Sequence, residues 1–157
     1  RGVSMAQSVK EAQALAYFNL GYNCAQSVFA AFHTEMGLDE VQALRLASSM
    51  GGGVGGLREV CGAFLGMSMA LGALLGYDTP DDMEAKKAHY ARIQALGDAF
   101  RQENGTLICR ELLESHGIAP SPTPADRSAA YYRDRPCAKY VAECARMAEE
   151  RLAQEKA

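Results

Sequence analysis

One segment of the sequence constrains the fold more than any other. The stretch from Leu57 to Leu75 is apolar on nearly every side of a helix, and it carries Gly62, Gly66 and Gly72. A helix that is apolar all round is buried among other helices, and its small residues let those neighbours approach closely. The longest apolar run, Val60 to Tyr77, is interrupted by four glycines, which indicates a buried helix and not a membrane span.

Most of the remaining chain has the apolar period of amphipathic helices. The pattern predicts helices over 5–20, 24–36 and 82–104, one beginning at Asp39, a short one capped by Thr106, and a final one beginning at Pro136. No segment reads as a convincing strand. We therefore expect an all-α, single-domain bundle of five to seven helices around the central apolar, glycine-containing helix. The domain covers residues 5–157, and residues 1–4 before Met5 read as an added remnant.

The charge of the chain argues against one class of partner. Among 157 residues, 16 Lys and Arg stand against 19 Asp and Glu, for a net charge of -3. A protein that holds nucleic acid by bulk charge needs a surplus of basic groups, so we expect no nucleic-acid partner. The beginning of the chain lacks the charged and apolar regions of an export signal. Together with the missing membrane span, this favours a cytoplasmic protein.

Cysteine is the residue type that points to chemistry. The chain has five cysteines, and no two of them form a C-x-x-C pair. This spacing differs from that of zinc fingers, zinc ribbons, thioredoxin-type motifs and bacterial ferredoxins. Structural disulfides are disfavoured in the cytosol, so the cysteines are expected to be buried apolar residues, metal ligands or redox groups. Any site that they share must be assembled by the tertiary fold.

Four of the cysteines lie near the start of a predicted helix: Cys24, Cys61, Cys109 and Cys137. The free amides and the dipole of a helix N-terminus stabilise an anion, so we expect a lowered pKa for these thiols and sulfurs that cluster. Cysteine is also among the most buried residue types, and inert thiols are the alternative. Cys144 lies well inside the final helix, and we expect it to be such a structural residue.

Five glycines fall within the six residues from Gly51 to Gly56. Neither a regular helix nor a strand tolerates such a run, whereas glycine permits unusual backbone angles or close approach to another group. The run lacks the pattern of a dinucleotide-binding loop or a Walker A loop. We predict cofactor contacts at Gly52, Gly53, Gly55 and, in the following helix, Gly62. A tightly packed loop is the alternative.

Five short segments carry a recurring pattern of cysteines and glycines: Gly21–Gln26, Gly51–Gly55, Val60–Gly66, Cys109–Leu113 and Pro136–Cys137. With them the chain resembles, from about residue 12 to residue 148, the C_GCAxxG_C_C family of bacterial and archaeal proteins. The family is described as redox-active and is defined by four cysteines and a Cys-Gly-Ala-x-x-Gly motif. The resemblance implies that its four cysteines are those at the helix starts, with Cys144 as an addition.

Three functions are compatible with four such cysteines. In the first, clustered thiolates carry out thiol–disulfide or electron-transfer chemistry, as in a thiol–disulfide oxidoreductase, with a redox partner protein, a small thiol or another electron donor. In the second, Cys24, Cys61, Cys109 and Cys137 are ligands of a transition-metal ion or an iron–sulfur cluster. In the third, the chain is a structural or interaction module with inert thiols.

Overall fold

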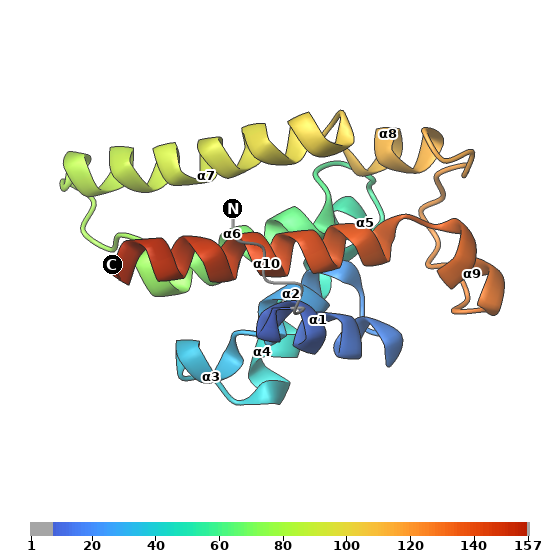
Figure 1. Cartoon of the computed structure of the whole chain (residues 1–157), viewed down its shortest axis with the longest axis horizontal. Coiled ribbons are helices and arrows are strands. Elements are labelled where there is room, and N and C mark those ends of the chain that lie inside the picture. The colour runs from blue at the N-terminus through green and yellow to red at the C-terminus, as the bar shows by residue number, and fades with distance from the viewer. Residues whose placement is uncertain (1–7, 157) are drawn as a thin grey trace.

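A computed structural model of the chain describes residues 8–156, and Figure 1 shows it as an assembly of helices. Within this part of the chain there is one isolated antiparallel bridge, between Val60 and Ile108, and no strand. The predicted all-α fold is confirmed. The predicted remnant at residues 1–4 and the domain start at Met5 lie outside the described residues. The elements in chain order are α1 (Val9–Asn19), α2 (Cys24–Ala30), α3 (His33–Met36), α4 (Glu40–Leu46), the 3-10 helix η1 (Ser48–Met50), α5 (Gly51–Val54), α6 (Gly62–Leu75), α7 (Met83–Asn104), α8 (Cys109–Glu114), α9 (Ala129–Asp134) and α10 (Cys137–Lys156).

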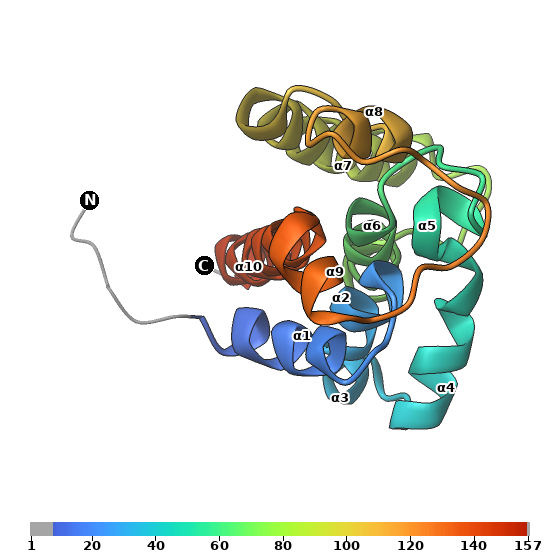
Figure 2. The same ribbon diagram turned by 90° about the vertical axis from the view of Figure 1, so that its right-hand side faces the viewer.

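Two helices, α2 and α6, form the centre of the core. Helix α6 packs against α2, α10, α7, α5 and α3, while α2 packs against α6, α1, α10 and α4. Figure 2 shows α6 between α7 on one side and α2 on the other. The sequence predicts a core around one apolar helix. In the structure the core surrounds two helices, α2 and α6, because most of α2 is buried as well. Six of the helices have seven or more residues, and the other described helices are short.

The contact between α2 and α6 depends on two glycines one turn apart. A Cβ atom at Gly62 would lie 2.7 Å from Sγ of Cys24, and one at Gly66 would lie 2.5 Å from the carbonyl oxygen of Ala25. Both distances are shorter than side-chain Cβ atoms show in proteins. Residues four apart lie on the same face of a helix, so the two glycines form one flat surface against the first turn of α2. This packing explains the glycine spacing of the Cys-Gly-Ala-x-x-Gly segment.

Two of the predicted helices have different boundaries. The one predicted over residues 24–36 is divided, since α2 ends at Ala30 and α3 begins at His33. The one predicted from Leu57 begins at Gly62. Residues 59–61 instead pair with residues 107–109: the Cys61 amide donates to the Leu107 carbonyl at 2.8 Å, and the Cys109 amide donates to the Glu59 carbonyl at 2.6 Å. These bonds to a distant part of the chain replace the first helical turn.

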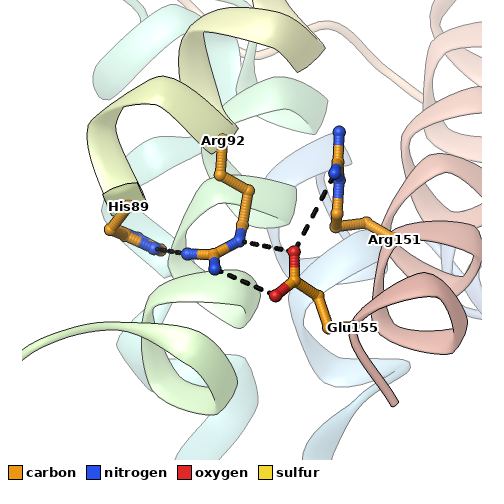
Figure 3. A network of polar contacts seen from close by, with 4 residues as sticks. All are labelled: His89, Arg92, Arg151 and Glu155. Carbon is orange, nitrogen blue, oxygen red and sulfur yellow. Dashed lines mark hydrogen bonds and ion pairs between the residues drawn. The ribbon is translucent and has the colours of Figure 1, made fainter. Parts of the chain in front are cut away.

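Helix α7 lies along the outside of the bundle and is attached differently at its two ends (Figure 1). Its buried residues, Leu96, Gly97 and Phe100, lie in the second half of the helix. In the first half, Arg92 donates to both carboxylate oxygens of Glu155 on α10, at 3.1 and 3.2 Å, and to Nδ1 of His89 at 2.8 Å (Figure 3). The network of Arg92 thus ties the first half of α7 to α10, while the buried residues of the helix lie in its second half.

Within residues 8–156, no helix combines the length and the apolar content needed to cross a membrane. The longest helix, α7, has 22 residues but carries charged side chains along its length.

Candidate functional site

A cavity of about 480 Å³ brings together three of the predicted site cysteines. Cys24, Cys109 and Cys137 line it, and they are the first residues of α2, α8 and α10, respectively. The glycine run contributes to the wall, as does the loop that includes Pro122 and Pro124. Three helix N-termini that are far apart in the sequence therefore meet at one cavity.

The N-terminus of α2 is held in place by the polar residues that flank Cys24. The Asn23 side chain accepts from the Gln26 amide at 2.8 Å, and the Gln26 side chain accepts from the Asn23 amide at 3.0 Å, so the predicted cap at Asn23 is confirmed. The same two side chains donate to the carbonyls of Ser48 and Leu44, at 3.1 and 3.0 Å. A capping box of this kind satisfies amides that the helix leaves free. Here it also fixes Cys24 relative to the segment from α4 to η1.

The glycine run forms a left-handed turn beside Cys24. Five consecutive residues, from Gly52 to Gly56, have φ between 57° and 82°, Val54 among them. Left-handed backbone costs about 1–2 kcal/mol for each residue that has a Cβ atom, which is why the run is almost entirely glycine. The turn directs the Gly52 amide to the sulfur of Cys24.

The four glycines predicted to contact a cofactor divide into two pairs. Gly52 and Gly55 line the cavity, where a ligand can reach them, and their contact with a cofactor remains a prediction. Gly53 and Gly62 pack against protein atoms. A Cβ atom at Gly53 would lie 2.6 Å from the Glu59 amide nitrogen, and Gly62 lies against Cys24 as described above.

Cys61 and Cys109 lie on the paired segments 59–61 and 107–109. Cys61 is the N-cap residue of α6 and is buried, and it is not among the residues that line the cavity. Cys109 is half-buried and lines the cavity. The N-cap of α8 is Ile108, so the prediction that Thr106 caps this helix is wrong. Thr106 instead accepts a hydrogen bond from the Ile108 amide at 3.1 Å.

Burial, and not the helix N-terminus, dominates the pKa of three of the four site thiols. Removal from water raises the pKa of Cys24, raises that of Cys61 well above its usual value, and raises that of Cys137 to about 12. Backbone amides near Cys24 and Cys61 act in the opposite direction, as the helix-start argument expects, but they are outweighed. The prediction of a lowered pKa is therefore wrong for these three cysteines.

The same pKa changes show that the sulfurs lie within electrostatic range of one another. A charge on Cys24 raises the pKa of Cys61 and of Cys137, and a charge on Cys109 raises the pKa of Cys24. Cys144 is fully buried in α10, and burial raises its pKa well above the usual value, with a further contribution from Cys61. Cys144 is thus close to Cys61 but is separate from the residues that line the cavity.

Three arginines line the cavity together with the cysteines. Arg58 is 8% exposed, and it donates to Sγ of Cys109 at 3.7 Å and to the Ser121 carbonyl at 2.8 Å. The sequence places Arg58 near Cys61, whereas the fold directs its side chain to Cys109. Arg127 and Arg135 complete the set.

Arg127 is a lining residue that sequence reasoning did not identify. It donates to the carbonyls of Phe18 and Tyr22 at 2.8 and 2.6 Å, and its guanidinium lies 4.7 Å from the ring centre of Tyr131. These contacts join the segment before α9 to the end of α1. No local pattern marks this residue, because the two carbonyls to which it donates are more than 100 positions away in the sequence.

The arrangement of the thiols also bears on the predicted metal site. All five cysteines have free thiols. Among residues 8–156, no group of three or more His, Cys, Asp or Glu side chains is placed to hold a metal ion. A transition-metal or iron–sulfur site at Cys24, Cys61, Cys109 and Cys137 stays a prediction.

Comparison with known proteins identifies a family. A search of curated proteins and a search of solved structures each found no match. A family model described as "Putative redox-active protein (C_GCAxxG_C_C)" matches residues 22–151, which include all the residues that line the cavity except Gly21. The match covers most of the chain and contains the four cysteines at the helix starts. The chain belongs to the C_GCAxxG_C_C family.

Proposed function

We propose that the chain is a thiol–disulfide redox protein that acts through Cys109 and Cys24 at the cavity. The observation that carries this proposal is the meeting of three family cysteines and the buried Arg58 at one cavity. All three lining cysteines are half-buried, and Cys109 is the attacking residue because it accepts a hydrogen bond from Arg58. A guanidinium next to a sulfur stabilises the thiolate that attacks a disulfide. We assign Cys24 as its partner, since both residues line the cavity and a charge on Cys109 raises the pKa of Cys24. A charge on Cys109 also raises the pKa of Cys137, so a peptide map must distinguish the two pairings.

The reaction transfers two electrons in two steps of thiol–disulfide exchange. The Cys109 thiolate attacks one sulfur of a substrate disulfide, the substrate S–S bond breaks, and the first half leaves as a thiolate. The Cys24 thiol then gives its proton to that leaving thiolate and attacks Sγ of Cys109. The second half of the substrate leaves as a thiolate, and the protein keeps a Cys24–Cys109 disulfide. The substrate is reduced and the protein is oxidised, and a reducing thiol reverses the sequence.

A thiol count combined with peptide mapping tests this proposal. The reduced protein is treated with hydroxyethyl disulfide, and the free thiols are counted after denaturation. We expect the count to fall by two, and the peptide map to show a bond between Cys24 and Cys109. The Cys109→Ser variant should lose this change, while the Cys144→Ser variant should keep it.

Three outcomes contradict the proposal. An unchanged thiol count in the wild-type protein would show that the cavity thiols do not undergo exchange. A disulfide that joins Cys61 to Cys144, with Cys109 still free, would place the chemistry away from the cavity. A Cys109–Cys137 bond would reject Cys24 as the partner of Cys109.

A further inference from the structure

The charge of the cavity indicates which class of molecule it accepts. We propose that the cavity binds small disulfides and thiols that carry a carboxylate or another anionic group near the sulfur. This proposal rests on the thiol–disulfide function and adds the substrate class. Three features support it: the burial of Arg58, the contacts of Arg135 and Arg127, and a described lining that contains no Asp or Glu.

Arg58 is a buried cation without an acidic partner among the described residues. Its side chain is more than nine-tenths buried, and it lines the cavity with one nitrogen against Cys109 and another against the Ser121 carbonyl. No ion pair within residues 8–156 includes it. A buried charge is costly unless an opposite charge or several hydrogen bonds compensate it. An anion in the cavity supplies that compensation.

Arg135 offers a second cationic group to the same space. Its guanidinium lies 4.8 Å from the ring centre of Tyr131, which orients it by a cation–π contact. Within the described part of the chain, its side chain has no hydrogen-bond acceptor and no acidic partner. A guanidinium that is oriented in this way matches the two oxygens of a carboxylate. Arg127 adds positive charge, and two of its nitrogens already donate to backbone carbonyls.

The lining residues give the cavity the opposite charge to that of the whole protein. Its described lining contains three arginines and no Asp or Glu. The whole chain has a net charge of -3. Long-range attraction by the whole protein therefore favours a cation, whereas the local field of the cavity favours an anion. If the protein prefers anionic to cationic ligands, the charge of the cavity and not that of the whole protein decides the preference.

The position of Cys109 connects the anion site to the chemistry. Arg58 contacts Sγ of Cys109, and both side chains line the same cavity as Arg135. A ligand with its carboxylate on a guanidinium and its sulfur a few bonds away can present that sulfur to Cys109. The volume, about 480 Å³, suits a small molecule. The substrate class is thus a small acidic disulfide, or the acidic thiol that it yields.

Three symmetric disulfides of different charge test the proposal: dithiodipropionate (anionic), hydroxyethyl disulfide (neutral) and cystamine (cationic). The rate at which each one oxidises the reduced protein is measured at low ionic strength. We expect dithiodipropionate to react about tenfold faster than hydroxyethyl disulfide, and cystamine to react slowest, since a charge-assisted contact contributes on this scale. Added salt should reduce the difference between the three.

A pair of arginine variants assigns the preference to the cavity. Arg135→Gln should lower the ratio of the dithiodipropionate rate to the hydroxyethyl disulfide rate by about fivefold or more. Arg133→Gln removes the same charge two residues away, from an exposed side chain that pairs with Asp134 and does not line the cavity. This control should keep the wild-type ratio. Equal effects of the two variants would mean that net charge, and not the cavity, sets the preference.

A ligand without sulfur separates this proposal from the function on which it rests. Adipate carries two carboxylates and cannot undergo exchange. We expect it to slow the reaction with hydroxyethyl disulfide and to raise the melting temperature of the wild-type protein, with smaller effects on Arg135→Gln. If all three disulfides react equally fast and adipate has no effect, the anion site is wrong and the redox function stands. If adipate binds but no disulfide reacts, the redox function is wrong, and so is the assignment of this substrate class.

Discussion

A cysteine at a helix start does not always have a lowered pKa, and Cys24 and Cys61 show the reason. The amide of Gly52 and those at the start of α2 lower the pKa of Cys24, but burial raises it by more. The balance is the same at Cys61. Desolvation of a fully buried group can shift a pKa by several units, which is more than a few amide contacts return. Arg135 and Arg58 also lower the pKa of Cys137, and burial outweighs them there as well.

The glycine run gives a prediction at the residue scale. Gly53 and Gly55 both have left-handed backbone, with φ of 63° and 57°. A Cβ atom at Gly53 would lie 2.6 Å from the Glu59 amide nitrogen, whereas at Gly55 its nearest neighbour would be the Ser49 carbonyl oxygen at 3.7 Å. We expect Gly55→Ala to lower the free energy of unfolding by about 1 kcal/mol through backbone strain alone. Gly53→Ala should lower it by about 3 kcal/mol, because the clash is added.

Urea unfolding followed by circular dichroism measures both variants under reducing conditions. The comparison separates close packing from the backbone conformation that the two positions share. Equal losses would show that the Glu59 segment moves away from residue 53 at little cost.

At the scale of the element, the spacing of glycines in α6 controls the approach of α2. Gly62 lies against Cys24, while a Cβ atom at Gly72 would meet nothing closer than His89 Nε2 at 4.0 Å. We expect Gly62→Ala to destabilise the protein by about 1–3 kcal/mol, because α2 must move away. Gly72→Ala, the matched control in the same helix, should stabilise it by about 0.5–1 kcal/mol through helix propensity.

The Gly62→Ala variant also has a chemical readout. Since the added methyl group would meet the Cys24 sulfur, the formation of the Cys24–Cys109 disulfide should slow in this variant and remain normal in Gly72→Ala. Both the unfolding midpoint and the rate of thiol loss are therefore measured. A stable Gly62→Ala protein with normal exchange would show that the glycine surface does not position Cys24.

The polar contacts between α7 and α10 predict a local effect. Arg92 and Arg151 lower the pKa of Glu155, with the hydrogen bond from Arg92 as the largest contribution. Glu155→Gln removes the negative charge from this network (Figure 3). We expect faster hydrogen exchange in the last turns of α10 and in the first half of α7, because the buried residues of α7 all lie in its second half. The exchange of α2 and α6 should stay unchanged, and a uniform increase would contradict this local role.

At the scale of the whole molecule, the buried thiols make stability depend on alkaline pH. Burial raises the pKa of Cys24, Cys61, Cys137 and Cys144 in the folded protein. The unfolded chain loses these protons near pH 8.5, while the folded chain retains them, so stability falls as the pH rises above that value. One fully buried thiol costs up to about 2 kcal/mol between pH 8 and pH 10.

Urea unfolding at pH 8 and at pH 10, with a phosphine reductant, tests this dependence. We expect Cys144→Ala to lose less stability than the wild-type protein over the same interval, by up to about 2 kcal/mol, since one buried thiol is absent. The comparison of pH values within each protein cancels the cost of the substitution itself. Equal losses in the two proteins would mean that the Cys144 thiol ionises in the folded state as it does in the unfolded chain.

Features that depend on nearby residues could be predicted from the sequence. The side chain of Asn23 caps α2, and Gly105 ends α7 after Asn104, so each boundary is set by a residue next to it. The structure confirms both predictions. The all-α fold follows from the apolar period, which is also local. The family cysteines could be named because their segments have a recognisable spacing.

The cavity and the protonation of its thiols were decided only by the tertiary structure. The helix predicted from Leu57 begins later because residues 59–61 bond to residues 107–109, and Arg127 binds carbonyls more than 100 positions away. Burial that results from such distant contacts raises the pKa of Cys24, against the local effect of its helix start. Helix formation is governed by neighbouring residues, whereas burial and electrostatic environment depend on the whole chain. The sequence by itself thus determined the helices and the cysteine set, and the packing of distant segments determined what surrounds each thiol.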